Sequence, residues 1–105
     1  FVYKAIILRT HPEILKKRLK QKKYSIKKIA ENLQAEILGD CSFHAYSSYG
    51  IEKVFELDNS EISIEKTLDL LISIVKNEKI KRNFKKIDWL ETLEKDNTLT
   101  KYFEV

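Results

Sequence analysis

Apolar and polar residues alternate in blocks that predict strands and helices in turn. Residues 1–8 form a nearly continuous apolar run, rich in β-formers and interrupted only by Lys4, which is typical of a strand buried on both faces. Residues 10–13 (THPE) then form a capping box with an early proline, and apolar residues follow at helical spacing. This pattern predicts a helix that ends near Gln21.

A second, longer helix is predicted to start after Ser25, which has the side chain of an N-cap. We expect it to run to about Ser47 with Gly39 inside it, because residues 47–50 (SSYG) resemble a helix terminus. Apolar residues recur along it at three- and four-residue steps, at Ile26, Ile29, Ala30, Leu33, Ile37 and Cys41.

The second half of the chain predicts a strand, a helix and a tail. Residues 53–57 (KVFEL) indicate a short strand and residues 58–60 a turn, and Ser63 is the expected cap of a helix that runs to Lys76. That helix carries Ile64, Leu68, Leu71, Ile72 and Val75. The predicted order is β-α-α-β-α plus a short C-terminal tail, an α/β fold with a parallel sheet and flanking helices.

The tail contains residues 87–93 (IDWLETL), in which Ile87, Leu90 and Leu93 predict a short amphipathic turn beside Trp89. Two hypotheses stay open for this tryptophan. The tail can fold back and bury Trp89 against the helices, or Trp89 can dock on a partner protein as an aromatic anchor.

Composition and length limit the possible classes. Hydrophobic residues make 43% and charged residues 34% of 105 residues, which suits a globular domain. Two strands cannot cover three apolar helices, and the sequence has no methionine and opens on a buried strand, so we expect a fragment of a longer protein.

No apolar run or leader pattern predicts a membrane span or export, so the cytoplasm is expected. Cys41, His11 and His44 are too few for a metal site.

Positive charge is concentrated near the start of the chain. Lys and Arg outnumber Asp and Glu by 20 to 16, and residues 9–28 hold nine of these cations against one carboxylate, Glu13. Such a patch suits nucleotide phosphates or RNA, although a solvated helix face is the alternative.

Residues 8–37 (LRTHPEILKKRLKQKKYSIKKIAENLQAEI) resemble the adenylate-kinase-like CINAP family. The landmarks that carry the resemblance are Leu8-Arg9-Thr10, Arg18-Leu19, Lys22-Lys23-Tyr24, Asn32 and Glu36. Two departures stand out. Lys22-Lys23 replaces the family's Arg-Gly, and the family's glycine-rich phosphate loop precedes the region of resemblance, with neither Gly39 nor Gly50 in a context to replace it.

The resemblance implies that residues 1–78 are the C-terminal part of a P-loop nucleoside monophosphate kinase domain, with a lid at about 21–31, and that residues 79–105 are a charged tail. The implied function is that of an ATP-dependent monophosphate kinase or ATPase, with magnesium held through the nucleotide and the missing N-terminal half. Implied partners are a small-subunit ribosomal protein and rRNA, through a role in small-subunit maturation. The alternative is a non-catalytic remnant or split half that binds protein or RNA.

Candidate site residues follow from the same resemblance. Arg18 and Lys22 are the expected catalytic pair because lid cations stabilise the transferring phosphoryl group, with solvated helix charges as the alternative. Lys22 also occupies the position of an ATP-contacting arginine. Arg9 ends a strand where α/β folds bind ligands, and either contacts the cofactor or pairs with a carboxylate. Asn59 and Ser60 are expected at the adenine, or act only as turn formers.

Two further polar residues lie on the predicted second helix. Glu36 and Asn32 are not expected to be catalytic, because phosphoryl transfer does not require a general base. We expect Glu36 and Asn32 to stabilise the lid or to pair with Arg18 or Arg9.

Overall fold

The computed structural model describes residues 4–76 and 86–103. The described residues form two strands and five α-helices, which confirms the mixed α/β class. The start of the predicted tail, up to residue 85, lies outside the described residues. In chain order the elements are β1 (Ala5–Arg9), α1 (Pro12–Gln21), α2 (Ile26–Leu38), α3 (Asp40–Tyr49), β2 (Val54–Asp58), α4 (Ile64–Val75), α5 (Trp89–Lys95) and a 3₁₀ helix (Leu99–Tyr102).

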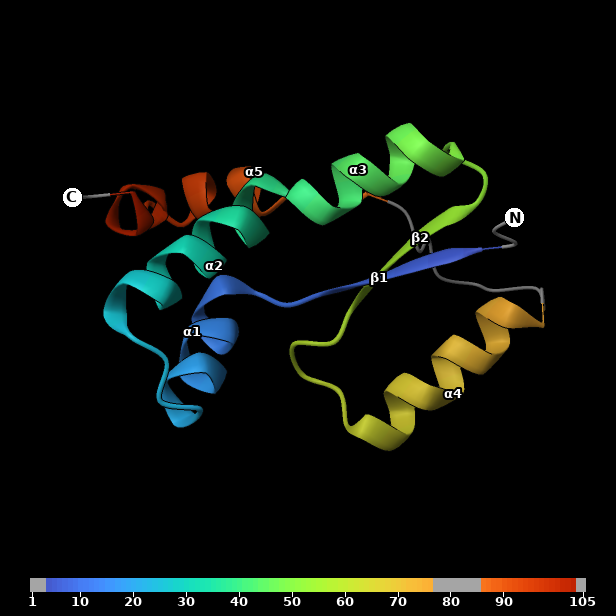
Figure 1. Cartoon of the computed structure of the whole chain (residues 1–105), viewed down its shortest axis with the longest axis horizontal. Helices are drawn as coiled ribbons and strands as arrows, with labels where there is room; N and C mark the ends of the chain where they lie inside the picture. Colours follow the sequence, from blue (N-terminus) through green and yellow to red (C-terminus); the bar gives the residue numbers. More distant parts are fainter. Residues whose placement is uncertain (1–3, 77–85, 104–105) are drawn as a thin grey trace.

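The two strands form a parallel pair in which Ala5 lies opposite Val54 and Arg9 lies opposite Asp58. Helices α3 and α4 lie on opposite sides of the pair (Figure 1). Side chains of a strand alternate between faces, so Leu57 packs with α4 while Glu56 points to α3. Because the strands are parallel, their carboxyl ends meet at one edge, next to α1 and α2.

The long helix predicted from Ser25 to about Ser47 is wrong in one respect, because it breaks at Gly39. This glycine has a φ of 70°, in the left-handed region that favours glycine, and it both ends α2 and precedes α3. The break changes which side chains face inward on α3. Ser42 and Ala45 are buried, whereas Cys41, expected on the apolar face, is exposed.

The N-terminal caps agree with the sequence in two cases out of three. Ser25 and Ser63 accept hydrogen bonds from the first turns of α2 and α4, as predicted. The capping box at residues 10–13 is wrong, because His11 is the N-cap of α1 and its Nδ1 accepts the Glu13 N–H at 3.1 Å. The Thr10 hydroxyl donates instead to the loop after β2.

The C-terminal elements pack on α1 and α2. Leu93 of α5 and Tyr102 of the 3₁₀ helix join a core cluster with Leu19, Ile29, Leu33 and Ile37. Trp89 is 6% exposed, so the hypothesis that the tail folds back is confirmed for this tryptophan. The expected apolar set is partly wrong, because Leu90 is exposed and Trp89 and Leu93 form the buried pair.

Helix α4 carries two apolar rows, and only one packs on the sheet. Leu70, Leu71 and Ile74 pack with Leu57 in a second core cluster. The other row is 50–81% exposed and consists of Ile64, Leu68, Ile72 and Val75.

Strand β1 is less buried than the apolar run predicted, because Leu8 is 45% exposed. Within the described ranges β1 has one neighbouring strand, β2, so its other edge has no strand beside it there. None of the helices in those ranges is long and apolar enough to cross a membrane.

The attachment of the 3₁₀ helix should depend on pH through Glu13. Hydrogen bonds from Lys101 and then Tyr102 lower the pKa of the Glu13 carboxyl from 4.5 to about 2. Because folding lowers this pKa, the stabilisation is present above about pH 4.5 and is lost as the pH falls towards 2. We therefore expect thermal melts to show a steeper loss of melting temperature below pH 4.5 in the unsubstituted protein than in Glu13→Gln.

Glu94→Gln removes an exposed carboxylate of α5 and is the control, which should keep the original pH profile. Parallel profiles for the unsubstituted protein and Glu13→Gln would contradict the role of Glu13.

Candidate functional site

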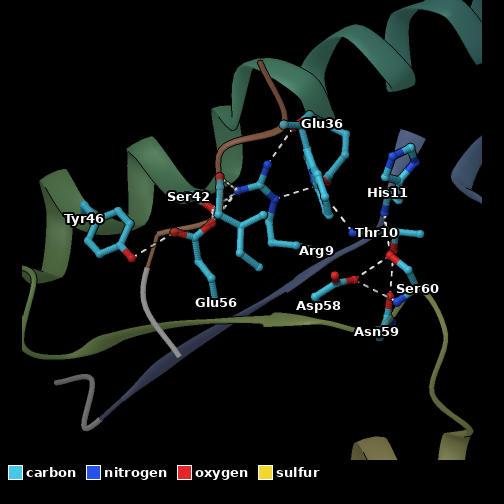
Figure 2. Close-up of polar contacts among 12 residues, drawn as sticks. Arg9, Thr10, His11, Glu36, Ser42, Tyr46, Glu56, Asp58, Asn59 and Ser60 are labelled. Carbon is cyan, nitrogen blue, oxygen red and sulfur yellow. Dashed lines mark hydrogen bonds and ion pairs between the residues drawn. The ribbon is translucent and has the colours of Figure 1, made fainter. Parts of the chain in front are cut away.

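A buried arginine lies at the centre of the polar structure (Figure 2). The side chain of Arg9, the last residue of β1, is 3% exposed. Its Nε donates to Glu36 of α2 and its Nη1 to Glu56 of β2. Nη2 donates to the Glu36 carbonyl at 2.8 Å, and Nη1 also donates to the Ile87 carbonyl at 3.0 Å. One guanidinium thus joins both strands, the end of α2 and the segment before α5.

Each carboxylate of this cluster has further donors. Glu56 is fully buried and accepts the hydroxyls of Ser42 and Tyr46, both at 2.9 Å. Glu36 accepts the Trp89 indole N–H at 2.8 Å. Among the described residues no buried side-chain nitrogen or oxygen lacks a hydrogen-bond partner. The cluster is therefore a satisfied network that holds the C-terminal segment on α2.

The environment shifts the pKa of two members. Burial alone would lower the pKa of the Arg9 guanidinium, but hydrogen bonds and charge attraction from Glu36 and then Glu56 outweigh burial and raise it. Burial, then the hydrogen bond to Glu56, raises the pKa of Tyr46 to about 12. Arg9 therefore stays charged and Tyr46 stays a neutral donor at physiological pH.

The two hypotheses for Arg9 now differ in support. The structure shows the carboxylate pair, while a contact between Arg9 and a nucleotide stays a prediction. Glu36 pairs with Arg9, one of the partners expected for it, and the Asn32 amide donates within α2 to the Lys28 carbonyl.

Sequence reasoning missed Glu56. A carboxylate flanked by Val54, Phe55 and Leu57 in a buried strand was the available signal, because a buried charge requires a partner.

The loops after β1 and β2 are joined at the carboxyl edge of the sheet. The Thr10 hydroxyl donates to the Asn59 side-chain oxygen at 2.7 Å, and the His11 N–H donates to the Ser60 hydroxyl oxygen at 2.7 Å. Asp58 in turn accepts the Ser60 N–H at 2.9 Å. These bonds fix the Asn59–Ser60 loop beside the start of α1, which is the turn role that the sequence allowed for it.

The structure brings Arg18 to this loop. Its Nη2 lies 3.3 Å from the Asn59 carbonyl oxygen and 3.4 Å from the Ser60 carbonyl oxygen, and Nη1 lies 3.4 Å from the Asn59 side-chain oxygen. These distances are long for N–H···O bonds, whose usual length is about 2.9 to 3.0 Å. Lys22 is the C-cap of α1, exposed and one turn beyond Arg18.

Two hollows flank the Arg9 cluster. One, of about 530 Å³, opens at the carboxyl edge among His11, Ser60, Ile62 and Trp89. The other, of about 610 Å³, lies against α3 and the segment before α5 and is mainly apolar, with Phe43, Ile51 and Leu90 in its wall. Over the described part of the chain, no group of three or more His, Cys, Asp or Glu residues could hold a metal ion.

No protein-family model matches the chain, but its sequence is similar to those of several archaeal proteins. A protein of Methanocaldococcus jannaschii described as "Putative adenylate kinase" is 37% identical over 86 residues, which are 82% of this chain and 45% of the relative. Proteins with the same description from Archaeoglobus fulgidus and Pyrococcus abyssi are 36% and 33% identical, over 86% and 82% of this chain and 51% and 46% of the relatives. The chain is homologous to these proteins and spans about half the length of the curated relatives it matches.

Substitutions of Arg9 and Glu56 should lower the free energy of unfolding by different amounts. Arg9→Gln leaves two carboxylates facing each other without a cation and should lower the free energy of unfolding by about 3 to 5 kcal/mol. Glu56→Gln leaves one cation with one carboxylate and should cost less, about 1.5 to 3 kcal/mol for the lost charge-assisted hydrogen bond. Urea denaturation followed by circular dichroism measures both.

Glu94→Gln is the matched exposed control and should change the free energy of unfolding by less than about 0.5 kcal/mol. Equal losses for Arg9→Gln and Glu56→Gln would show that charge balance does not govern the cluster.

Proposed function

From this homology we propose that the chain supplies the lid and the adenine-side loop of an ATP-dependent nucleoside monophosphate kinase or ATPase of the CINAP type. The observation that carries the proposal is the position of Arg18, whose guanidinium lies over the Asn59–Ser60 loop at the carboxyl edge of a parallel sheet. That edge is where open α/β sheets bind nucleotides.

Arg9 and Arg18 suit different roles. Arg9 is buried and held by two carboxylates, so it positions α2 and the loops. Arg18 is partly exposed, and its three bonds of 3.3 to 3.4 Å go to uncharged oxygens. Exchanging those bonds for charge-assisted bonds to phosphate is favourable, because a charged acceptor roughly doubles the strength of each bond. Lys22 would add a second cation from the lid.

The hollow at the carboxyl edge suits the base better than the phosphates. Its wall includes Glu13, Asp58 and Glu61, whose negative charge disfavours a phosphate but tolerates an amino purine. Ile62 and Trp89 offer apolar surface for a ring, and Ser60 lines the same hollow. We place the base there and the phosphates towards Arg18 and Lys22.

The remaining half of the kinase would provide the phosphate-binding loop. The motif G-x-x-x-x-G-K-[ST] does not occur in these residues, and the relatives are about twice as long as the aligned region. The exposed row of α4 and the exposed Leu8 of β1 offer an apolar surface for that half, in the same or a separate chain. Magnesium would be held through the ATP phosphates and that half. Magnesium would supply charge neutralisation at the transferring phosphoryl group.

The same proposal includes a role in small ribosomal subunit maturation in the cytoplasm, with a small-subunit ribosomal protein and rRNA as partners. The resemblance of residues 8–37 to the CINAP family supports it. Residues 1–78 would then be the kinase part with its lid at about 21–31, and residues 79–105 a tail.

Arg18→Ala and Lys22→Ala should each lower ATP turnover ten- to hundredfold when the chain is joined to its phosphate-loop half. Each removes one charge-assisted contact to phosphate, worth about 1.5 to 3 kcal/mol. A coupled assay of ADP production measures the loss. Lys66→Ala removes an exposed lysine of α4 and should leave turnover within about twofold. Unchanged turnover in both lid variants would reduce Arg18 and Lys22 to solvated helix charges.

The 105 residues alone should not transfer phosphate to AMP, because their sequence does not contain the G-x-x-x-x-G-K-[ST] loop that wraps the ATP phosphates in backbone N–H groups. Incubation of the purified chain with ATP, magnesium and AMP, followed by chromatography of the nucleotides, tests this. The joined protein is the positive control. Turnover by the chain alone would place the phosphate site within these residues.

A further inference from the structure

The α1–α2 hairpin carries more positive charge than one nucleotide needs. Residues 14–30 hold eight cations and no carboxylate, and the cations are Lys16, Lys17, Arg18, Lys20, Lys22, Lys23, Lys27 and Lys28. The whole chain has a net charge of +4, so the residues outside this segment carry a net charge of −4. The chain is therefore strongly polarised, with its positive charge on one structural unit.

The tip of this hairpin is open to solvent throughout. Every residue from Lys20 to Lys28 is exposed, and these nine residues include five of the lysines. Tyr24 is 46% exposed and Ile26 is 89% exposed between them. Such a tip presents point charges around one aromatic ring.

Lys23 adds a backbone observation. Its φ is 62°, in the left-handed region that glycine adopts without strain and a lysine does not. A glycine would therefore form this turn more easily. The chain instead has a lysine here, between Lys22 and Tyr24 in the exposed turn of the hairpin.

The hairpin has more cations than one triphosphate can contact. Under the proposed function, Arg18 and Lys22 already bind the triphosphate. A partner with phosphates spaced along a chain can use the remaining lysines at once, whereas one nucleotide cannot. A protein partner fits less well, because lysine is depleted in protein–protein interfaces. A membrane surface fits less well too, because the tip offers only two large apolar side chains to insert.

We propose that the α1–α2 hairpin binds RNA, with Lys20, Lys23, Lys27 and Lys28 on backbone phosphates and Tyr24 stacked on an unpaired base. Aromatic rings among basic side chains are a common means of holding single-stranded nucleic acid. This inference deepens the assembly part of the proposed function by naming the surface. It does not depend on phosphoryl transfer.

The test is fluorescence anisotropy of labelled single-stranded and duplex RNA with the chain, without nucleotide, over a series of salt concentrations. Lys20→Gln/Lys27→Gln/Lys28→Gln should weaken single-stranded RNA binding at least tenfold. It should also reduce the slope of log affinity against log salt by about 2, because each lost phosphate contact removes about 0.7. Lys66→Gln/Lys76→Gln/Lys86→Gln removes the same charge from exposed lysines outside the hairpin and should change affinity by less than about threefold. Equal losses for the two triple variants would overturn the proposal in favour of a general charge effect.

Tyr24→Ala should weaken binding of the single-stranded RNA at least fivefold and leave duplex binding unchanged, because stacking needs an unpaired base. Phosphatidylserine vesicles are the second probe. If they bind the chain as tightly as RNA does and the hairpin triple variant abolishes both, the surface is a membrane site and the proposal fails. Kinase turnover is measured without RNA, so either proposal can fail while the other stands.

Discussion

The buried guanidinium of Arg9 is the interaction on which the arrangement of the chain depends. It replaces the water around one cation with two carboxylates and two backbone carbonyls, drawn from three other segments of the chain. Charges are costly to bury, so this contact is tolerable only when α2, β2 and the segment before α5 are all in place. The ion cluster therefore selects a relative placement of elements that apolar packing alone would leave less well defined.

That placement has a direct effect on the carboxyl edge of the sheet. With the end of α2 fixed at Arg9, the hairpin of α1 and α2 extends beyond the strands, and Arg18 lies over the loop that follows β2. Thr10 and His11, which follow β1, also donate hydrogen bonds to this loop. The parallel register and the buried ion cluster thus cooperate to bring one partly exposed guanidinium to the edge where a nucleotide is proposed to bind.

Most elements could be predicted from local pattern because their physical causes are local. The apolar run of β1, the serine caps of α2 and α4 and the helical spacing of α4 are all decided within a few residues. The break at Gly39 could not be predicted from the sequence, because glycine is tolerated inside a helix unless tertiary contacts favour a left-handed residue. Here the end of α2 contacts Arg9, a residue 30 positions away.

The site shows the same division. The strand ends and the cations of α1 could be located from sequence, whereas the bonds of Glu56 and Trp89 depend on contacts between distant segments.

The trio of Arg9, Glu36 and Glu56 also constrains how this sequence can change over time. Loss of Arg9 would leave two carboxylates without a cation, so a tolerated replacement of this arginine is expected to arrive together with a change at Glu36 or Glu56. Exposed lysines outside the α1–α2 hairpin, such as Lys66, are under no such restriction. We therefore expect these three residues, spaced 27 and 20 positions apart, to be retained in relatives whose overall sequence identity is low. Distant relatives could be recognised by an arginine at the end of one strand, a glutamate near the end of a helix and a glutamate within the next strand.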